Sequence, residues 1–421
     1  MNAETSALSR TTTVGVFADT NLRWYFTGQF VSVIGSLLQS AVLSLLIIDL
    51  AGTVDAAYWV GVIGGLMLGP ATLLAPLAGL FLDRCDTKRI LFVTTVLGFI
   101  QAVALAYLTY AHLASIFAIN ILVLCTGLIT VIDAPGRNVF VKELVGRHQV
   151  RYASMVFLSL GNIAQMVGPG AAGFLVWYCG YPITFMVNSV SFVVFLSALV
   201  MIRLAPHRSL PARTAPQPGV RESLVRGAVY ILRHREIATC IVLTGVVSTF
   251  GFSYTSLLSV IVRDMLGGNP VVFSHLALSS GAGAILTLVM VTCCHKFLSH
   301  KVLFVSGVVT LGIASVLLSL TKDVTSAAIL LFFAGYGFTV SLITIRSSIT
   351  HLVRYDLVGI VTGYSYTFSC GGMVLGSWGA GIVANRLGCP AELAICGCVL
   401  VVVGVASYFL PGIDHLDKKA T

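Results

Sequence analysis

Residues 83–92 read DRCDTKRILF, and residues 295–304 read HKFLSHKVLF. The two stretches lie 212 positions apart, because 295 minus 83 is 212, which is half of the 421-residue chain. Each stretch separates two apolar runs of about the length of a bilayer-spanning helix. A basic turn that recurs at matching places indicates a duplicated six-helix unit. Two such halves that rock about a site between them are the plan of a membrane transporter.

The composition excludes a water-soluble protein. Hydrophobic residues make up 57% of the chain, charged residues only 10%, and the mean hydropathy is +0.96. Each bilayer crossing needs roughly 20 apolar residues with little charge. Residues 1–21 are polar and show no cleavable signal, so we expect the first helix to target the protein. The ten cysteines lie mostly in apolar runs and are interpreted as small apolar residues. The close pairs Cys293–Cys294 and Cys396–Cys398 lack zinc-ribbon spacing and histidine partners, so we expect no metal site and no cofactor.

Twelve apolar segments predict an all-α integral membrane fold with two pseudo-symmetric six-helix halves. The segments are 24–48, 57–80, 90–111, 114–135, 154–176, 182–203, 238–260, 273–294, 302–320, 325–345, 358–382 and 391–410. The predicted division is a tail at 1–22, a first bundle at 23–205, a linker at 206–236, a second bundle at 237–411 and a tail at 412–421.

The cations predict the orientation. If the N-terminus is cytoplasmic, only Arg263, Lys322 and Arg386 of the 25 lysines and arginines fall on the opposite side. This asymmetry follows the positive-inside rule, so we expect both termini in the cytoplasm of a bacterial inner membrane. The basic net charge of +9 is then a topology signal and requires no nucleic-acid partner.

The linker between the halves has two parts. Residues 206–219 are rich in proline and are expected to be extended. In residues 221–235, we place four apolar residues on one helical face and the arginines mostly elsewhere; the apolar residues are Leu224, Ala228, Ile231 and Leu232. This pattern predicts an amphipathic helix on the inner leaflet, with a regulatory or partner-binding role as the alternative.

Small residues recur at helical spacing in both halves. Residues 161–173 read GNIAQMVGPGAAG, in which Ala164, Gly168 and Ala172 lie four apart and Pro169 adds a kink. Such a face lets a neighbouring helix approach closely. The second half offers Gly372, Gly376 and Ala380 at a constant offset of 208, since 372 minus 164 is 208. We predict a close helix contact at both places.

Residues 79–89 carry a family resemblance. Gly79, Asp83, Arg84 and Lys88 resemble the signature between helices two and three of the major facilitator superfamily, whereas Asp86 stands where that family usually has glycine. The resemblance implies a cytoplasmic gate in which the acid and the basic residues latch onto neighbouring helix ends. We assign Gly79, Asp83, Arg84, Lys88, Asp133 and Arg137 to this gate, with Arg84 pairing Asp133. The alternative is that these charges only set the topology.

A narrower resemblance concerns the enterobactin-exporter and macrolide-efflux branch of that superfamily. Residues 21–35, NLRWYFTGQFVSVIG, are similar to the first helix of that branch, and residues 133–145, DAPGRNVFVKELV, to the end of its fourth helix. The small-residue motif of 161–173 also resembles one that marks exporter branches. The resemblance implies export of a bulky, partly apolar small molecule such as a siderophore or a drug.

Candidate coupling groups are few. A proton-driven carrier usually places a carboxyl or a histidine inside the bundle. The predicted spans hold Asp49 at the outer end of helix one and Asp133 at the inner end of helix four, and we take these two as the candidates for a coupling proton. Interfacial charge is the alternative for both.

Substrate contacts are expected on helices one, four, seven and ten, which surround the cavity in the superfamily that the chain resembles. On helix one, Gln29, Ser32, Ser36 and Gln39 form one stripe, which must face protein or a wet cavity because a polar stripe in lipid is costly. Helix packing by hydrogen bonds is the equal alternative. The other candidates are Asn120, Thr126, Phe252, Tyr254 and Tyr336.

The sequence also bears on functions other than export. The spans contain no catalytic constellation and no phosphate-binding loop, so we expect neither an enzyme nor an ATP-driven pump. A lipid flippase on the same scaffold is the rival transporter, because a cavity with so few charges would suit an acyl chain. A non-transporting receptor or scaffold is the rival of another class. The expected partners are a small-molecule substrate, membrane lipids and, as a candidate coupling ion, the proton.

Overall fold

The computed structural model describes residues 19–52, 55–82, 85–145, 149–203, 220–294, 299–354 and 357–409. Its helices are α3 (Thr20–Ala51), α4 (Ala56–Leu82), α5 (Thr87–Tyr110), α6 (Ile116–Leu144), α7 (Val150–Met201), α8 (Val220–Arg233), α9 (Arg235–Gly251), α10 (Ser253–Ser256), α11 (Leu258–Val260), the π-helix η1 (Ile261–Met265), α12 (Pro270–Cys294), α13 (His300–Leu320), α14 (Val324–Leu352), α15 (Val358–Leu387) and α16 (Cys389–Tyr408). These ranges contain no strand, so the predicted all-α fold is confirmed.

The helices match the predicted spans. Within the described ranges, 11 helical segments are long and apolar enough to cross a membrane. One of these segments lies in α7 and covers both the fifth and the sixth predicted spans. Gly180, with φ 78° and ψ 170°, interrupts the helix between the two, and glycine adopts this conformation because it has no Cβ.

Two helices continue past their predicted ends. The apolar run of the fourth span stops at Pro135, yet α6 continues to Leu144 with that proline inside it. Likewise, α14 continues through Arg346 to Leu352, although the tenth span was predicted to end at 345. A hydropathy pattern detects only the apolar part of a helix, which lies in the membrane. The backbone hydrogen bonds of α6 and α14 continue beyond that part, so both helices are longer than predicted. Arg137 and Arg346 therefore lie on regular helices, about two turns before the helix ends.

The seventh span is broken, which corrects the prediction of one continuous helix over 238–260. Helix α9 ends at Gly251, Phe252 forms a bend, and the short α10 and α11 precede the π-helix η1. A π-helical turn leaves some backbone groups without regular partners and is frequent at functional sites. Neither proline nor charge marks the break, so the sequence pattern gave no sign of it.

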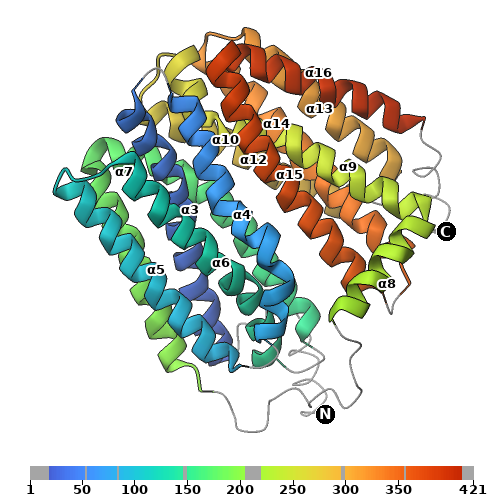
Figure 1. Ribbon diagram of the computed structural model, residues 1–421, viewed down its shortest axis with the longest axis horizontal. Helices are drawn as coiled ribbons and strands as arrows, with labels where there is room; N and C mark the ends of the chain where they lie inside the picture. The colour runs from blue at the N-terminus through green and yellow to red at the C-terminus, as the bar shows by residue number, and fades with distance from the viewer. Residues whose placement is uncertain are drawn as a thin grey trace. The chain divides into compact units, whose positions relative to one another are not determined.

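Contacts between Cα atoms group the chain into two compact units. One comprises residues 1–42 and 73–217, and the other comprises residues 43–72 and 218–421. In the first unit, α5 packs along α7 and α6 (Figure 1). In the second, α13 packs between α16 and α14, and α15 packs along α9 (Figure 1). Residues 43–72 are grouped with the second unit, although they belong to the first predicted bundle. The units therefore do not test the predicted bundles at 23–205 and 237–411, and this division stays a prediction.

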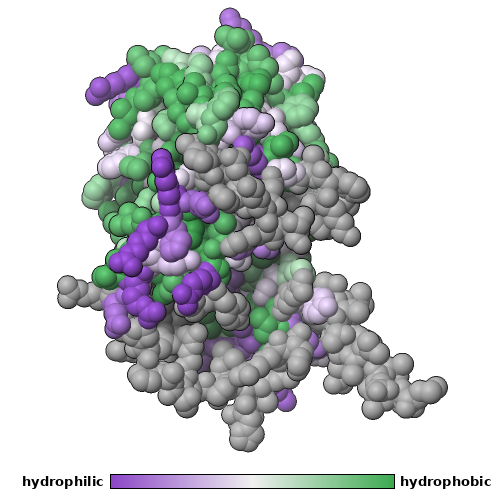
Figure 2. Space-filling view, turned by 90° about the vertical axis from the view of Figure 1, so that its right-hand side faces the viewer, coloured by the Kyte–Doolittle hydropathy of each residue, from purple (hydrophilic) through white to green (hydrophobic). Residues whose placement is uncertain are grey.

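The exposed side chains of the spans are mainly apolar. Large hydrophobic residues such as Phe117, Val190 and Val402 are more than half exposed. On the face shown in Figure 2, hydrophobic residues cover most of the upper part, and hydrophilic residues gather at its margins. A surface of this kind is stable against lipid and not against water. The protein is therefore a multi-pass membrane protein.

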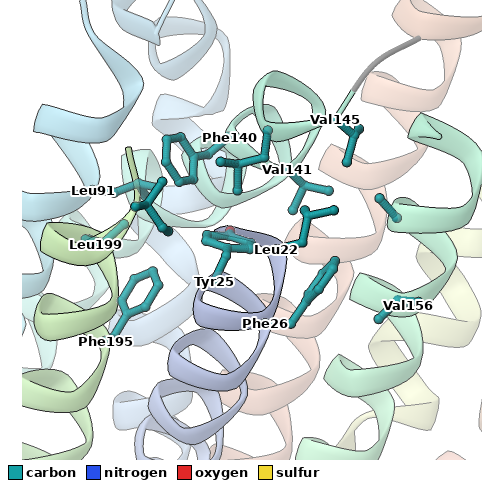
Figure 3. Close-up of a cluster of buried hydrophobic side chains, with 13 residues drawn as sticks. Leu22, Tyr25, Phe26, Leu91, Phe140, Val141, Val145, Val156, Phe195 and Leu199 are labelled. Carbon is teal, nitrogen blue, oxygen red and sulfur yellow. The ribbon is translucent and has the colours of Figure 1, made fainter. Parts of the chain in front are cut away.

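A buried aromatic cluster joins the helices of the first unit. Tyr25 of α3 lies at its centre, with ring centroids 5.3 Å from Phe140 of α6 and 6.0 Å from Phe195 of α7 (Figure 3). Leu22, Leu91 and other aliphatic side chains surround these rings, so side chains of α3, α5, α6 and α7 meet in one cluster. The cluster fixes the ends of four helices next to the polar site described below.

Helix α8 forms where the amphipathic helix was predicted, but it does not lie only on lipid. A Cβ at Gly227 would lie 3.0 Å from Tyr364, so α8 packs closely on α15. Val225, Val229 and Leu232 on its other side are exposed, so the prediction that Leu232 shares the face of Ile231 was wrong. These three follow the three-four spacing of one helical face, which remains available to the inner leaflet that the sequence analysis predicts.

Candidate functional site

A buried ion pair lies near the end of α6. The Nε atom of Arg137 donates to Oδ2 of Asp133 over 2.6 Å, and the two side chains are 8% and 18% exposed. The pair has i, i+4 spacing, so both side chains leave the same face of the helix. Thr94 of α5 donates to the other carboxylate oxygen over 2.8 Å. Both oxygens of Asp133 therefore have donors within the first unit.

The guanidinium of Arg137 connects three helices. Its Nη2 atom donates to the Ser32 hydroxyl of α3 over 3.3 Å, and its Cζ atom lies 4.4 Å from the ring centre of Phe195 of α7. The Tyr25 hydroxyl donates to the backbone carbonyl of Arg137 over 2.9 Å. A buried cation needs such partners, because an unpaired charge in an apolar interior is strongly unfavourable. Nη1 still has no partner among the described residues.

The predicted gate is only partly described. Asp83 and Arg84 lie outside the described residues, so the predicted pair of Arg84 with Asp133 is not tested, while Gly79 lies within α4. Lys88 donates to the carbonyl of Ile202 at the end of α7 over 2.8 Å. A cation at a helix C-terminus is favourable, and this is the kind of contact that the latch requires. The latch itself stays a prediction.

Two contacts at this end were not foreseen. Asp86 caps α5 by accepting from the backbone N–H groups of Lys88 and Arg89. This role explains an acid where the superfamily signature has glycine, because an aspartate satisfies free N–H groups at a helix start. Thr87 donates to the Glu143 carboxylate over 2.7 Å and ties α5 to the end of α6. The aspartate before 87–110 was the available sequence signal for the cap.

The small-residue face of α7 lies against α3. A Cβ on Gly168 would lie 2.7 Å from the Leu37 Cβ and 3.0 Å from the Ile34 carbonyl oxygen, so nothing larger than glycine fits without movement. Ala164 and Ala172 are fully buried, and Pro169 lies within the same helix. In the second unit, a Cβ on Gly372 would lie 2.5 Å from the Gly245 carbonyl oxygen of α9, and Gly376 lies against Thr249. Ala380 is 5% exposed.

Another close seam was missed. In the unit of residues 43–72 and 218–421, the first half of α4 packs on α15. A Cβ added to Gly381 would lie 2.9 Å from the Cα atom of Gly61, so the two backbones are in close contact. The Ser377 hydroxyl donates to the Gly61 carbonyl over 3.2 Å. Ser256 lies 2.6 Å from the same hydroxyl. The glycines at 61, 64 and 65 were the sequence signal, but spacing alone does not say which helix they face.

The polar stripe of helix one is buried. Gln29, Ser32 and Gln39 are at most 5% exposed, and Ser36 donates to the Ser32 carbonyl. Gln39 donates to Gln101 over 3.0 Å and accepts from Asn188 over 2.8 Å. These bonds are the helix packing that the sequence left as an alternative for the stripe. The carboxamide oxygen of Gln29 is buried and has no hydrogen-bond partner in the part of the chain that the structure describes.

The other predicted residues are scattered. On α6, the buried side-chain oxygen of Asn120 has no hydrogen-bond partner among the residues that the structure describes, whereas Thr126 donates to the carbonyl one turn earlier. Phe252 lies at the break of the seventh span, Tyr254 lies 3.3 Å from Ser280, and Tyr336 is half-buried on α14. Asp49 is exposed at the end of α3. The described residues contain no cluster of His, Cys, Asp and Glu that could hold a metal ion.

Residues 11–421 match the family described as transmembrane secretion effector. The chain belongs to this family of major facilitator superfamily transporters. The match covers nearly the whole chain and confirms the resemblance seen in the sequence. It also supports a membrane transporter with secretion- and efflux-type relatives.

The curated relatives are distant and cover most of the chain. The staphyloferrin A transporter of Staphylococcus aureus is 21% identical over 92% of this chain and 96% of its own length. The multidrug efflux pump Tap of Mycolicibacterium fortuitum is 22% identical over 88% of this chain and 91% of its own. An uncharacterised transporter of the superfamily from Bacillus subtilis, YfiS, is 25% identical over 80% of each chain.

Solved transporters share the fold. An auto-inhibited peptide transporter of the POT family has a TM-score of 0.72 at 12% identity, covering 95% of this chain and 97% of its own. A bacterial homologue of the human lysosomal transporter Spinster, in an inward-facing and unoccupied conformation, has a TM-score of 0.70 at 14% identity, covering 94% and 97%. At these identities the likeness shows the fold alone.

Proposed function

We propose that the protein exports an amphipathic small molecule, of the siderophore or drug class, across a bacterial inner membrane by alternating access. The observation that carries this proposal is that a siderophore transporter and a multidrug efflux pump both align with about nine-tenths of the chain. The buried groups support it as well. The first unit has a buried polar site rather than a catalytic one, and its small-residue seams suit helices that repack as rigid bodies.

The gate is the mechanical part of this proposal. With both termini in the cytoplasm, the contacts of Lys88, Asp86 and Glu143 lie at the cytoplasmic ends of α5, α6 and α7. The seam of α4 on α15 then lies toward the outer side, because α4 begins there. In a carrier that works by alternating access, contacts at the two ends of the helices would have to be made and broken in turn.

Transport by everted membrane vesicles tests the function. Vesicles that carry the protein are offered ethidium, erythromycin, staphyloferrin A and a fluorescent lysophosphatidylcholine, with vesicles of the Gly168→Leu variant as the matched control. Uptake of ethidium, erythromycin or the siderophore by the unchanged protein alone supports export. Movement of the lysolipid alone would instead support the flippase. Movement of none of the four would support a receptor or scaffold.

Native cysteines test the orientation. Cys85 lies in the turn between α4 and α5, and Cys179 lies beside the break in α7, and both are exposed. In variants that retain only one of the two, a membrane-impermeant maleimide should label Cys179 in intact spheroplasts and Cys85 only in everted vesicles. The reverse pattern would place the termini outside.

A further inference from the structure

Glu392 is a buried acid that the sequence analysis did not single out. It lies in the first turn of α16 and is 1% exposed. Acids within membrane spans are costly and are retained mainly where they have a function. Neither the proposed export function nor the gate uses this residue.

The contacts of its carboxyl group are weak ones. Oε1 accepts from the Cys396 thiol one turn further along α16, over 3.0 Å. Oε2 is buried and has no hydrogen-bond partner among the described residues. The Ser253 hydroxyl of α10 lies close to the carboxyl group, but it donates to the Phe250 carbonyl over 3.0 Å. A thiol and a shared hydroxyl do not replace the strong donors that an isolated buried carboxylate needs.

The charged groups on the neighbouring elements do not pair with it. On η1, Arg263 donates to Asp264 and to the Gly52 carbonyl. Arg386, in the last turn of α15, and Lys322, after α13, are both exposed. Cys389, at the start of α16, is buried and adds only a thiol. No cation within the described ranges forms a salt bridge with Glu392.

The carboxyl lies beside the break in the seventh span. Ser253 starts α10, the first piece after the bend at Phe252, and both α10 and η1 pack on α16. Broken membrane helices, whose backbone groups are not all committed, are typical places for coupling ions in transporters. An ionisable group and a deformable segment are therefore in contact.

We propose that Glu392 is a proton-binding site of the transport cycle, and that its protonation controls the broken segment 253–265. This inference rests on the proposed export function only for its role in coupling. With a proton on Oε2, the group is a neutral acid that is stable as placed. When the proton leaves to water, the carboxylate must gain donors, and the nearest polar groups that can move are those of residues 253–265.

The two acids predicted from the sequence are less suited to this role. Asp133 is held by Arg137 and Thr94 at both oxygens, so its charge is already compensated. Asp49 is exposed at the end of α3 and is not buried among the helices. Glu392 alone of the three combines burial with an oxygen that has no partner.

Hydrogen exchange on the purified full-length protein tests the proposal without any substrate. Protection of residues 253–265, corrected for intrinsic exchange, is measured by mass spectrometry from pH 5 to pH 9. We expect it to fall as pH rises, by about tenfold for each unit of difference in proton affinity between the two conformations. Glu392→Gln, which stays neutral, should keep the low-pH protection throughout.

The matched control is Asp264→Asn, which removes an exposed acid of the same segment and should retain the pH dependence. Protection that does not change with pH in the unchanged protein would overturn the proposal, as would an unaltered pH profile in Glu392→Gln. If both variants lose the pH dependence of protection to the same extent, the dependence comes from the charge of the segment and not from Glu392, and the proposal is overturned as well. The hydrogen-exchange experiment measures no transport, so a negative result in it does not affect the proposed export function. A negative vesicle assay likewise does not affect the measured pH dependence.

Discussion

The arginines near the ends of α6 and α14 occupy matching places in the two halves but have different surroundings. Arg137 and Arg346 are 209 positions apart, since 346 minus 137 is 209, and both helices have 29 residues. Arg137 is buried and paired with Asp133. Arg346 is exposed, contacts the Ser369 hydroxyl at 3.4 Å, and has Leu342 where Arg137 has its acid. The duplicated cation thus has a structural role in one half and an accessible position in the other.

The different surroundings of Arg137 and Arg346 indicate different roles for the two arginines. The charge of Arg137 is committed to Asp133 of its own helix, to Ser32 of α3 and to Phe195 of α7, so it helps to fix the first unit. Ser369 also contacts Ser248 of α9 at 2.9 Å, so the second arginine belongs to a chain of hydroxyls that holds no formal counter-charge. We expect Arg346 to be the cation that can meet an anionic group of a substrate.

The largest expected effect is that of breaking the ion pair. Asp133→Asn leaves Arg137 buried without a counter-charge and should lower the free energy of unfolding by about 3–5 kcal/mol. Arg346→Gln, at the matching place, should change it by less than about 0.5 kcal/mol, because an exposed side chain is lost. Unfolding of the detergent-purified variants gives both values. Equal losses would remove the distinction between the two arginines.

The next effect concerns the small-residue seams. Gly168→Leu must push α7 away from Leu37 and should cost about 1–3 kcal/mol by overpacking, together with loss of vesicle transport. Val167→Leu, on another face, should retain transport and stability. If the repeat is functional, Gly376→Leu should act like Gly168→Leu. A harmless Gly376→Leu would confine the seam's role to the first half.

A smaller effect is expected from Tyr25→Phe, which keeps the ring in the aromatic cluster and removes only its hydrogen bond to the Arg137 carbonyl. The expected loss is about 1 kcal/mol, measured by the same unfolding experiment. Ser369→Ala, which removes the hydroxyl beside Arg346, is the counterpart in the other half and should cost less. A larger loss for Ser369→Ala would show that the second arginine is held more tightly than its exposure indicates.

The smallest effect tests the gate. Lys88→Met removes the charged donor to the Ile202 carbonyl and should cost about 0.3–1 kcal/mol. With Cys85 replaced by serine, it should also increase maleimide labelling of a Leu91→Cys variant in everted vesicles, because Leu91 is fully buried one turn from Lys88. Arg89→Met is the control, because Arg89 is exposed and its salt bridge is to Asp86, three residues earlier. Identical labelling of the two variants would argue against Lys88 as a latch.

The architecture could be predicted because hydropathy and charge act locally along the chain. Lipid requires long apolar helices, so twelve spans could be recognised without knowing their neighbours. The small-residue faces at 164–172 and 372–380 were equally visible, because helical spacing places residues four apart on one face. The ends of α6 and α14 were placed too early, because a helix can leave the apolar region and continue on protein contacts.

The functional groups were harder to predict. Asp133 and Arg137 were both assigned to the gate, and their i, i+4 spacing was a signal for a pair, but Asp133 was instead assigned to Arg84. Glu392 was overlooked because it follows Pro390 at the start of a span and reads as an interfacial charge. Its burial depends on α10 and η1, which are distant in sequence.

The sequence by itself determined the membrane class, the duplicated helices, the small-residue faces and the family, because each depends on composition or spacing along one segment. Only the tertiary structure decided which groups are buried together: the Asp133–Arg137 pair with Ser32 and Thr94, the Gln39 network, the seam of α4 on α15 and the lone carboxyl of Glu392. The physical reason is that the cost of a polar group inside a membrane protein depends on the partners brought to it by other helices, and spacing along one helix does not specify them.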